Sequence, residues 1–484
     1  MRARILASVV NEDHRKWWTL GAVSFGLFMI MLDNTIVNVA LPTIQSSLNL
    51  KISELEWVVT GYALTFGALM LTGGKLGDLF GRRKIFVVGL VIFTASSLAC
   101  GLANSAGMLI GARVVQGVGA ALMNPATLSI IVATFPTRQR GTAIGIWAGV
   151  SALALAIGPL VGGVITEKIN WSWIFFINVP IGVLAIAAAY MFIDESRDTS
   201  REQRPDVPGL VTSTVGLFAL SYALIEANSY GWTSTRILLA FGVAAVSLTA
   251  FLLLEHYQRL PMLELGLFRN KGFSGANSVM LLMGLAMFGV FFYVSLYVQR
   301  VIGYSPIEAG ASFLPWTVLI ILLAPQAGRL SDRYGPKWFV VGGMLVVTGS
   351  LLLFANMGEH ESFWGLLPAM LLGGIGMAAA MAPTTAAAMH SVRADKAGVG
   401  SAVLNSMRQV GGSLGIAIMG AIVAASAKPG GRDPVAFLHG FHRALELAAV
   451  FALTGAVVAV ATLRKIEHPH EQPREQPRAA AERA

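Results

Sequence analysis

The chain is poor in charged residues and in cysteine. Only 13% of its 484 residues are Asp, Glu, Lys or Arg, whereas an ordinary soluble protein has about 25%. Cys100 is the single cysteine, so an intramolecular disulfide and a cysteine-based metal site are excluded. With 55% hydrophobic residues, this composition excludes a soluble enzyme, a disordered chain and a secreted disulfide-rich protein.

Long hydrophobic runs are abundant instead. Segments such as 57–74 and 272–299 contain no charged side chain. Because about 20 apolar residues cross a bilayer as a helix, the pattern predicts an all-α polytopic membrane protein. Fourteen spans are predicted, near 17–41, 57–74, 85–103, 106–134, 141–166, 172–193, 207–231, 236–254, 273–298, 309–328, 338–357, 363–390, 398–425 and 443–463.

The positive charges indicate the orientation of these spans. The net charge is +9, and most Lys and Arg residues fall on one side when the predicted spans alternate in direction. Since positive residues stay in cytoplasmic loops, both ends of the chain are predicted inside the cell. The same bias explains the basic composition without nucleic-acid binding. The apolar run after Arg15 and Lys16 has no small-residue cleavage site, so we expect a retained first span and not a removed signal peptide.

The sequence also repeats itself. The pattern G-x-L-x-D-x-x-G occurs at 74–81 and at 328–335, each time between the second and third spans of a six-span half. Repeated halves with a site at their interface are typical of secondary transporters. The predicted units are an amino-terminal six-helix bundle (1–193), an inserted helix pair with cytoplasmic linkers (194–271), a carboxy-terminal six-helix bundle (272–463) and a disordered cytoplasmic tail (464–484).

Asp33 is the only acid deep inside a predicted span. It lies about 24 Å from the cytoplasmic start of that span at 1.5 Å per residue, in the outer half of the membrane. A carboxylate there costs at least about 2.5 kcal/mol. An acid whose exposure alternates can bind a proton on one side and release it on the other, so a proton-carrying role is predicted. The alternative is a carboxylate held permanently by hydrogen bonds to Asn34, Thr35 or Asn38.

Two arginines also fall inside predicted spans. Arg113 lies at a depth similar to that of Asp33, and both side chains should face the bundle interior. We expect Arg113 to favour ionised Asp33 or to replace its proton, with Gln116 on the same helix face; the alternative is a purely structural bond between helices. Arg408 has no acid at matching depth, and either substrate or backbone carbonyl groups remain open as its partner.

The repeated motif predicts a gate. In its first copy Asp78, Arg82 and Arg83 can form a latch between helices, and Asp332 occupies the equivalent place in the second copy. The alternative is that these charges only set the topology. Gly158, Pro159 and Gly162 cluster in the fifth span, where small residues permit close helix approach and proline permits bending. They predict a hinge and a seal between the halves, with static packing as the alternative.

The ninth span is rich in Met and aromatic residues, which can repack around varied apolar ligands. The alternative for them is contact with lipid or with neighbouring helices. Glu226 is a further candidate for a second titrating site. The predicted substrate-cavity residues are Asn34, Asn38, Gln116, Met287, Phe288, Phe292 and Arg408.

Several segments resemble one family. They are the first-span run 32–42 (LDNTIVNVALP), the loop 74–84, the fourth-span pattern Leu109-x-x-x-Arg113-x-x-Gln116-Gly117-x-Gly119, the glycine-rich stretch 149–163, and the segments 173–180 and 405–412. Together they resemble the major facilitator superfamily and, within it, the fourteen-span drug:proton antiporters. Leu79 is a departure, because an Arg is usual after the Asp in that motif, and one expected ion pair is therefore weakened.

The resemblance implies two six-helix bundles with two inserted helices, alternating access and proton-driven export. By that analogy Asp33 takes the proton, Arg113 tunes it, and spans 1, 4, 9 and 12 line the cavity. No cofactor other than the proton gradient is implied, and no metal. The expected partners are a small amphipathic substrate, protons and membrane lipids, with no nucleic acid. A monomer in the bacterial inner membrane is expected.

The resulting functional prediction is a proton-coupled antiporter that exports amphipathic drugs, lipophilic cations or dyes. The first alternative is an exporter of lipids, glycolipids or metabolites with the same fold. A membrane-embedded enzyme would need a dense cluster of acids or histidines at one membrane face, and the sequence has no such metal spacing, nucleotide loop or nucleophile triad. A sensor that binds ligand without transport is the last alternative.

Overall fold

The computed structural model describes residues 12–197, 206–259, 261–392, 397–426 and 434–463. Fourteen of its helical segments are long and apolar enough to cross a membrane, so the predicted number of spans is confirmed. The expected disorder of the tail 464–484 concerns residues outside the described ranges. Following the orientation predicted from the Lys and Arg distribution, with the start of the first helix inside the cell, we call the opposite end of the bundle the outer end.

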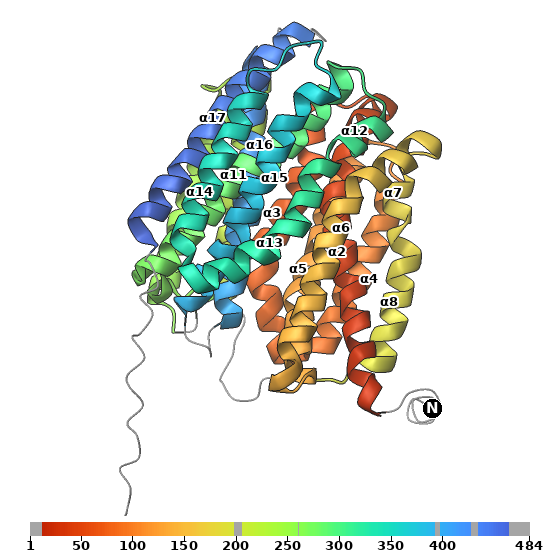
Figure 1. Cartoon of the computed structure of the whole chain (residues 1–484), viewed down its shortest axis with the longest axis vertical. Helices are drawn as coiled ribbons and strands as arrows, with labels where there is room; N and C mark the ends of the chain where they lie inside the picture. The colour runs from red at the N-terminus through yellow and green to blue at the C-terminus, as the bar shows by residue number, and fades with distance from the viewer. Residues whose placement is uncertain (1–11, 198–205, 260, 393–396, 427–433, 464–484) are drawn as a thin grey trace, which may run out of the picture.

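The first six spans form the amino-terminal half. Its helices are α2 (Glu12–Leu48), α3 (Ile52–Phe80), α4 (Arg82–Gly101), α5 (Ala106–Thr134), α6 (Thr137–Lys168), α7 (Trp173–Phe176) and α8 (Asn178–Phe192). The last two are separate helices of one span, Trp173–Phe192. Figure 1 shows these helices side by side as one group.

The last six spans form the carboxy-terminal half. Its helices are α11 (Lys271–Arg300), α12 (Pro306–Ser312), α13 (Leu314–Tyr334), α14 (Pro336–Phe354), α15 (Phe363–His390), α16 (Ala397–Ser426) and α17 (Pro434–Thr462). Here α12 and α13 share one span, Pro306–Tyr334. The inserted pair consists of α9 (Val207–Tyr230) and α10 (Thr235–Tyr257), followed by the short helix η1 (Leu265–Arg269).

Close helix packing repeats between the halves. A β-carbon at Gly89 of α4 would lie 2.8 Å from the carbonyl oxygen of Gly119 of α5. In the other half, a β-carbon at Gly343 of α14 would lie 2.7 Å from the carbonyl oxygen of Gly376 of α15. Glycine therefore lets the third and fourth helices of each half approach closely. The internal repeat seen in the motif at 74–81 and 328–335 thus extends to the packing.

The helix α3 is longer at both ends than its apolar run predicted. It begins at Ile52 and not near residue 57, because the backbone N–H of Lys51 donates to the Glu54 carboxylate at 2.8 Å and closes the first turn. At the other end it continues through Asp78 to Phe80. The segment 74–84, predicted as a loop, is therefore mostly helical.

Both copies of the repeated motif end at a glycine with positive φ. Gly81 follows α3 with φ of 113°, and Gly335 follows α13 with φ of 87°. Residues other than glycine rarely adopt a positive φ. Each glycine lets the chain leave one helix and enter the next, α4 or α14, within one residue.

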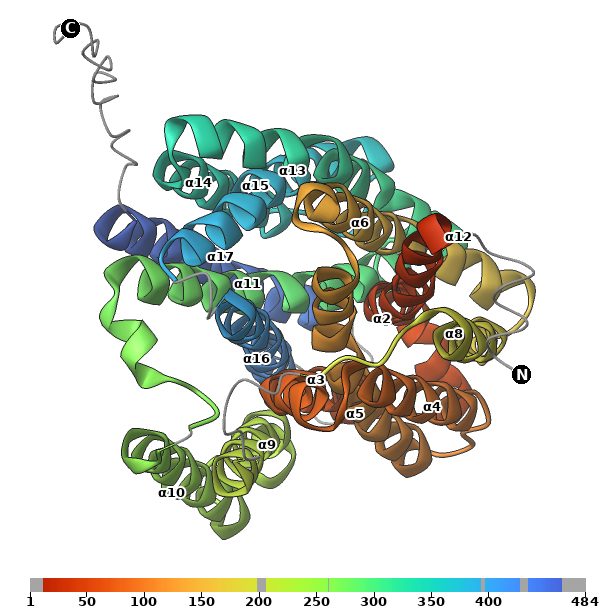
Figure 2. The ribbon, with the colours of Figure 1, turned by 90° about the horizontal axis from the view of Figure 1, so that it is seen from below.

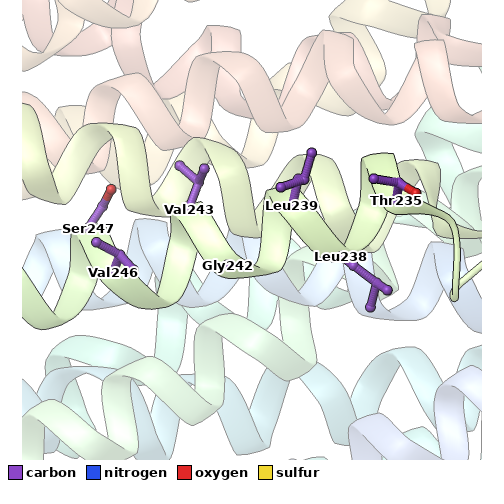
Figure 3. A pocket seen from close by; sticks show the side chains of 7 residues that line it. All are labelled: Thr235, Leu238, Leu239, Gly242, Val243, Val246 and Ser247. Carbon is purple, nitrogen blue, oxygen red and sulfur yellow. The ribbon is translucent and has the colours of Figure 1, made fainter.

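The inserted pair packs against the outside of the two halves. Its first helix, α9, contacts both α3 and α16, and Figure 2 shows α9 and α10 beside these helices at one edge of the bundle. Few residues of α10 are buried. An open, apolar hollow runs along this helix (Figure 3), lined by Thr235, Leu238, Leu239, Gly242, Val243, Val246 and Ser247. The face suits contact with lipid chains.

Asp206 anchors the linkers of the inserted pair. One carboxylate oxygen accepts from the backbone N–H of Gly209 at 2.8 Å and caps α9, and the other accepts from the backbone N–H of Met262 at 3.1 Å. Burial opposes the ionisation of Asp206, but these backbone hydrogen bonds outweigh it and lower the pKa of the carboxyl. Lys75 of α3 donates to the carbonyl oxygen of Pro261 at 2.9 Å, so the same linker is attached to the amino-terminal half.

We expect Asp206→Ala to reduce the free energy of unfolding by about 1–2 kcal/mol, because it removes a helix cap and leaves a buried N–H unpaired. Asp206→Asn keeps an acceptor at the cap and should lose less. Since the folded-state pKa is lowered, the carboxylate stabilises the fold above its ordinary pKa, and this contribution is lost as the pH falls through the folded-state pKa, so the variants are compared at one fixed pH near neutrality. Thermal unfolding in detergent, followed by tryptophan fluorescence, measures it; an Ala variant as stable as wild type would contradict the assignment.

Candidate functional site

Asp33 and Arg113 form a buried ion pair inside the amino-terminal half. Asp33 lies on α2 and Arg113 on α5, and their side chains are 0% and 1% exposed. Arg113 Nη1 lies 2.5 Å from Asp33 Oδ2. The expectation that both side chains face the interior and lie at the same depth is met. In this conformation the carboxylate contacts neither lipid nor bulk water.

Gln116 completes this pair from one turn along α5. Its amide nitrogen donates to Asp33 Oδ1 at 3.0 Å, and its amide oxygen accepts from Arg113 Nη1 at 2.7 Å. Both oxygens of the Asp33 carboxylate therefore have a partner. We refer to Asp33, Arg113 and Gln116 as the charge-pair site.

Arg113 has partners besides the carboxylate. Its Nε donates to the backbone carbonyl oxygen of Val58 on α3 at 3.0 Å. Its guanidinium carbon lies 4.2 Å from the centroid of the Tyr62 ring, a geometry that stabilises a cation. The arginine can therefore keep its position while the charge on Asp33 changes.

A second group of polar side chains supports Gln116. Ser97 of α4 accepts hydrogen bonds from Gln116 at 3.4 Å and from Asn178 of α8 at 3.1 Å, and it donates to the carbonyl oxygen of Phe175 at 2.9 Å. The site thus connects α2, α3, α4, α5 and the α7–α8 break. Sequence reasoning missed the roles of Tyr62, Ser97 and Asn178. Asn178 lies in the family-like segment 173–180, which was a signal for it, whereas no pattern in the sequence separates Tyr62 and Ser97 from ordinary polar residues in a span.

The remaining cavity candidates of the first span bond to their own helix. Asn34 donates to the carbonyl oxygen of Ile30 at 2.8 Å, and Asn38 donates to that of Asn34 at 3.3 Å. The carboxylate of Asp33 is held by side chains of α5. The structure therefore contradicts the alternative that hydrogen bonds to Asn34, Thr35 or Asn38 hold the carboxylate.

The candidates of the carboxy-terminal half lie apart from the charge-pair site. Met287 and Phe292 of α11 are buried, and a β-carbon at Gly412 of α16 would meet the ring of Phe288. Arg408 lies on α16, which packs against both α11 and α3. These residues line the contact between helices in this conformation, and their role toward substrate stays a prediction.

The glycines of the fifth span lie where two contacts require them. A β-carbon at Gly158 would meet the Thr35 hydroxyl of α2, and one at Gly162 would lie 2.7 Å from the carbonyl oxygen of Ile36. The backbone of Pro159 lies against Gly310 of α12, in the other half. Close approach thus occurs within the amino-terminal half and also between the halves.

The two motif copies differ in their ion pairs. Asp78 accepts hydrogen bonds from Arg82 at 2.9 and 3.0 Å across the break between α3 and α4. Arg83 donates to the carbonyl oxygen of Ile193 at 3.2 Å. In the second copy the position four residues after the acid is Pro336, which cannot pair, and Asp332 is exposed. The sequence-based expectation that Asp78 pairs with an arginine is met in the first copy.

The two halves are joined near their outer ends. Ser295 and Gln299 of α11 donate to the carbonyl oxygens of Asn38 and Val39 of α2 at 2.7 and 3.0 Å. Glu167 at the end of α6 accepts from the backbone N–H of Ile307 of α12 at 3.1 Å. Figure 1 shows α12 beside α6 at this end of the bundle. The outer side is therefore closed.

One more buried acid lies at this closure. Glu56 of α3 is 2% exposed and accepts a hydrogen bond from the Tyr293 hydroxyl of α11 at 2.7 Å. Asp33 is therefore not the only buried acid of a membrane-spanning helix, although Glu56 lies one turn from the end of α3 and not deep inside the span. The run of apolar residues begins at Trp57, but the helix begins at Ile52, and Glu54 at the capping position was the signal that could have shown it.

No group of three or more metal-ligating side chains was found in the described residues. The site consists of an ion pair and amides, which can hold or release a proton and change helix contacts. It contains no nucleophile placed beside a base. This chemistry suits a conformational cycle.

Comparisons with known proteins show the family of this chain. Residues 23–416 match the family model of the Major Facilitator Superfamily. The chain is 37% identical over 411 residues to the tetracenomycin C resistance and export protein of Streptomyces glaucescens, covering 85% of this chain and 76% of that protein. It is 34% identical over 466 residues to a puromycin resistance protein of Streptomyces alboniger, covering 94% of this chain and 92% of that protein.

A solved structure supports the fold. The crystal structure of a bacterial homologue of the human lysosomal transporter Spinster, in an inward-facing and unoccupied conformation, superimposes with a TM-score of 0.67 at 17% identity. The superposition covers 94% of this chain and 98% of that one. The family match and the relatives, together with this fold, identify the chain as a multi-pass membrane transport protein that belongs to the major facilitator superfamily.

Proposed function

We propose that this protein is a proton-coupled antiporter that exports amphipathic small molecules across the bacterial inner membrane by alternating access. The relatives named for antibiotic resistance and export support a drug efflux transporter. The proposed partners are the exported molecule, protons and membrane lipids, with no cofactor other than the proton gradient. A single copy of the chain carries the complete site.

The observation that carries the proton coupling is the burial of Asp33 against Arg113 between α2 and α5. A buried carboxylate and a buried guanidinium attract each other strongly. Protonation of Asp33 removes that attraction, while Val58 and Tyr62 still hold the arginine. Proton binding would therefore change the contact between α2 and α5, and a cycle of such changes can open the two sides in turn.

The available energy is sufficient for export. One charge that moves through 100 mV supplies about 2.3 kcal/mol, and each pH unit adds about 1.4 kcal/mol. One proton can thus sustain a substantial outward gradient of a neutral substrate. A lipophilic cationic dye such as ethidium is a suitable first probe, because it is amphipathic and fluorescent. When one dye cation exchanges for one proton no net charge moves, so the pH gradient alone drives this exchange.

Reconstitution in liposomes tests this function. With purified protein and an imposed pH gradient, we expect the dye to move against its own gradient toward the acidic side, and nigericin, which collapses the pH gradient, to stop it. Addition of dye should release protons from the acidic compartment. If dye moves equally with and without the gradient, proton coupling is wrong. If only lipids with acyl chains move, the alternative of a lipid exporter is correct.

A further inference from the structure

Glu56 is a buried acid that touches both halves of the transporter. It lies on α3, one turn from the outer end of that helix, and its Oε1 accepts from the Tyr293 hydroxyl of α11 at 2.7 Å. A third helix covers it, because a β-carbon at Gly420 of α16 would lie 2.5 Å from the Glu56 carboxyl carbon. The carboxyl is therefore enclosed between the amino-terminal half and two helices of the other half.

The groups around Glu56 supply little positive charge. On α11 its neighbour is the neutral phenol of Tyr293. On α9 its neighbour is Glu226, which interacts with it electrostatically as a second acid. The stretch of α16 opposite Glu56 presents Gly420. On α5, Arg113 is engaged with Asp33 and with the Val58 carbonyl group. Arg300 lies farther out on α11, near Tyr293.

A carboxyl group in such a place is buried at lowest cost as the neutral acid. A buried carboxylate needs a cation or several donors, and the neutral Tyr293 hydroxyl is one donor. Asp33 on α2 has an arginine and a glutamine as partners instead. The surroundings of Asp33 therefore stabilise the ionised carboxylate, whereas those of Glu56 favour the neutral acid.

The Glu56–Tyr293 bond belongs to the contacts that close the outer side. Ser295 and Gln299, on the same helix as Tyr293, bind carbonyl oxygens of α2. When the halves separate at this end, Tyr293 and Gly420 must move away from Glu56. Outer water can then reach the carboxyl and exchange its proton.

We propose that Glu56 is a second proton-binding site, whose protonation by outer water permits the outer side of the transporter to close. The proposal rests on the proposed antiport function. The ionised carboxylate favours the outer-open form, in which water solvates it. The protonated acid favours the closed form, in which Tyr293 binds it. Proton entry from outside thereby drives the step that turns the cavity toward the cytoplasm.

Distance measurement between spin labels tests the outer closure directly. One label replaces Ser46, exposed at the outer end of α2, and the other replaces His360, exposed in the outer connection between α14 and α15. Cys100→Ala removes the native thiol. The ratio of closed to open forms is measured between about pH 5 and pH 9, in full-length protein in lipid nanodiscs.

The measurement is made in an Asp33→Asn background, so that Asp33 does not titrate. We expect the ratio to fall with rising pH, by up to about tenfold per unit for one proton. Adding Glu56→Gln, which keeps the size and the acceptor, should make it independent of pH. Tyr293→Phe should reduce the closed form at every pH because one hydrogen bond is lost.

An equal pH dependence with and without Glu56→Gln would overturn the proposal. The proposal would also be overturned if the closed-to-open ratio depended on pH in the wild type but not in the Asp33→Asn background. That result would assign the titration to Asp33 and would leave proton-coupled export intact. Conversely, the antiport function would be refuted if liposomes containing the wild-type protein moved dye equally well without the pH gradient. This would hold even if the closed-to-open ratio still depended on the protonation of Glu56.

Discussion

Asp33→Asn should reduce gradient-driven dye transport to the rate of protein-free liposomes. The carboxamide keeps the shape of the side chain but cannot release a proton, and its NH2 group faces the Gln116 amide nitrogen, which donates to Asp33 at 3.0 Å in the wild type. One hydrogen bond is thus lost and Arg113 keeps an unbalanced charge. The measurement is dye accumulation in liposomes with an imposed pH gradient, together with dye binding at equilibrium, which should persist.

Folding must be separated from coupling in this variant. Breaking a buried ion pair by removal of one partner costs about 3–5 kcal/mol, so the unfolding temperature should fall as well. Glu446→Gln is a matched control, because it makes the same acid-to-amide change at an exposed position of α17. It should transport like the wild type. An Asp33→Asn protein that still needs and uses the pH gradient would show that Asp33 does not carry the coupled proton.

Gly163→Val should prevent closure of the outer side. Gly163 of α6 lies against the Pro306 carbonyl group of α12, and a β-carbon there would lie 3.0 Å from the Ile307 α-carbon. Because this contact joins the two halves, the strain falls on the closed form alone. Overpacking costs about 1–3 kcal/mol, which changes the closed-to-open ratio by roughly 5–150-fold.

The same helix offers a matched control for this second variant. At Gly149, apart from the neighbouring residues and backbone of α6 itself, no heavy atom of the described residues lies within 4 Å of the position that a β-carbon would take. Gly149→Val therefore makes the same chemical change to α6 without meeting α12. We expect Gly149→Val to transport normally and Gly163→Val to transport slowly, with the Ser46–His360 label distance lengthened. Equal rates and equal distances in the two variants would contradict the assigned closure.

The hydrophobic runs predicted the spans because membrane helices need long apolar stretches whatever their tertiary partners. Asp33 and Arg113 could be paired from the sequence, since equal depth and intolerance of lipid leave few arrangements. Tyr62 and Ser97 could not be predicted, because their role depends on how α3, α4 and α5 pack. The Glu56–Tyr293 bond joins residues 237 positions apart, and no local pattern specifies such a contact.

The same reasoning explains the errors at helix ends. A prediction from apolar runs ends each span at the nearest charged residue. The helix itself can begin before the apolar run, because a capping interaction can satisfy its first N–H groups. That is the case at Lys51 and Glu54. The breaks inside two spans, near Ile177 and Phe313, come just before Pro180 and Pro315 and follow from local backbone restrictions.

The positive φ angles at Gly81 and Gly335 show which part of the repeated motif is the same in both halves. The charges of the two motif copies have diverged, since Arg82 pairs with Asp78 whereas Pro336 cannot pair with Asp332. The left-handed corner has not diverged, because an alanine at either position would distort the exit from one helix and the entry to the next. What the halves share at this corner is a backbone angle, and that angle restricts both positions to glycine whatever the neighbouring side chains do.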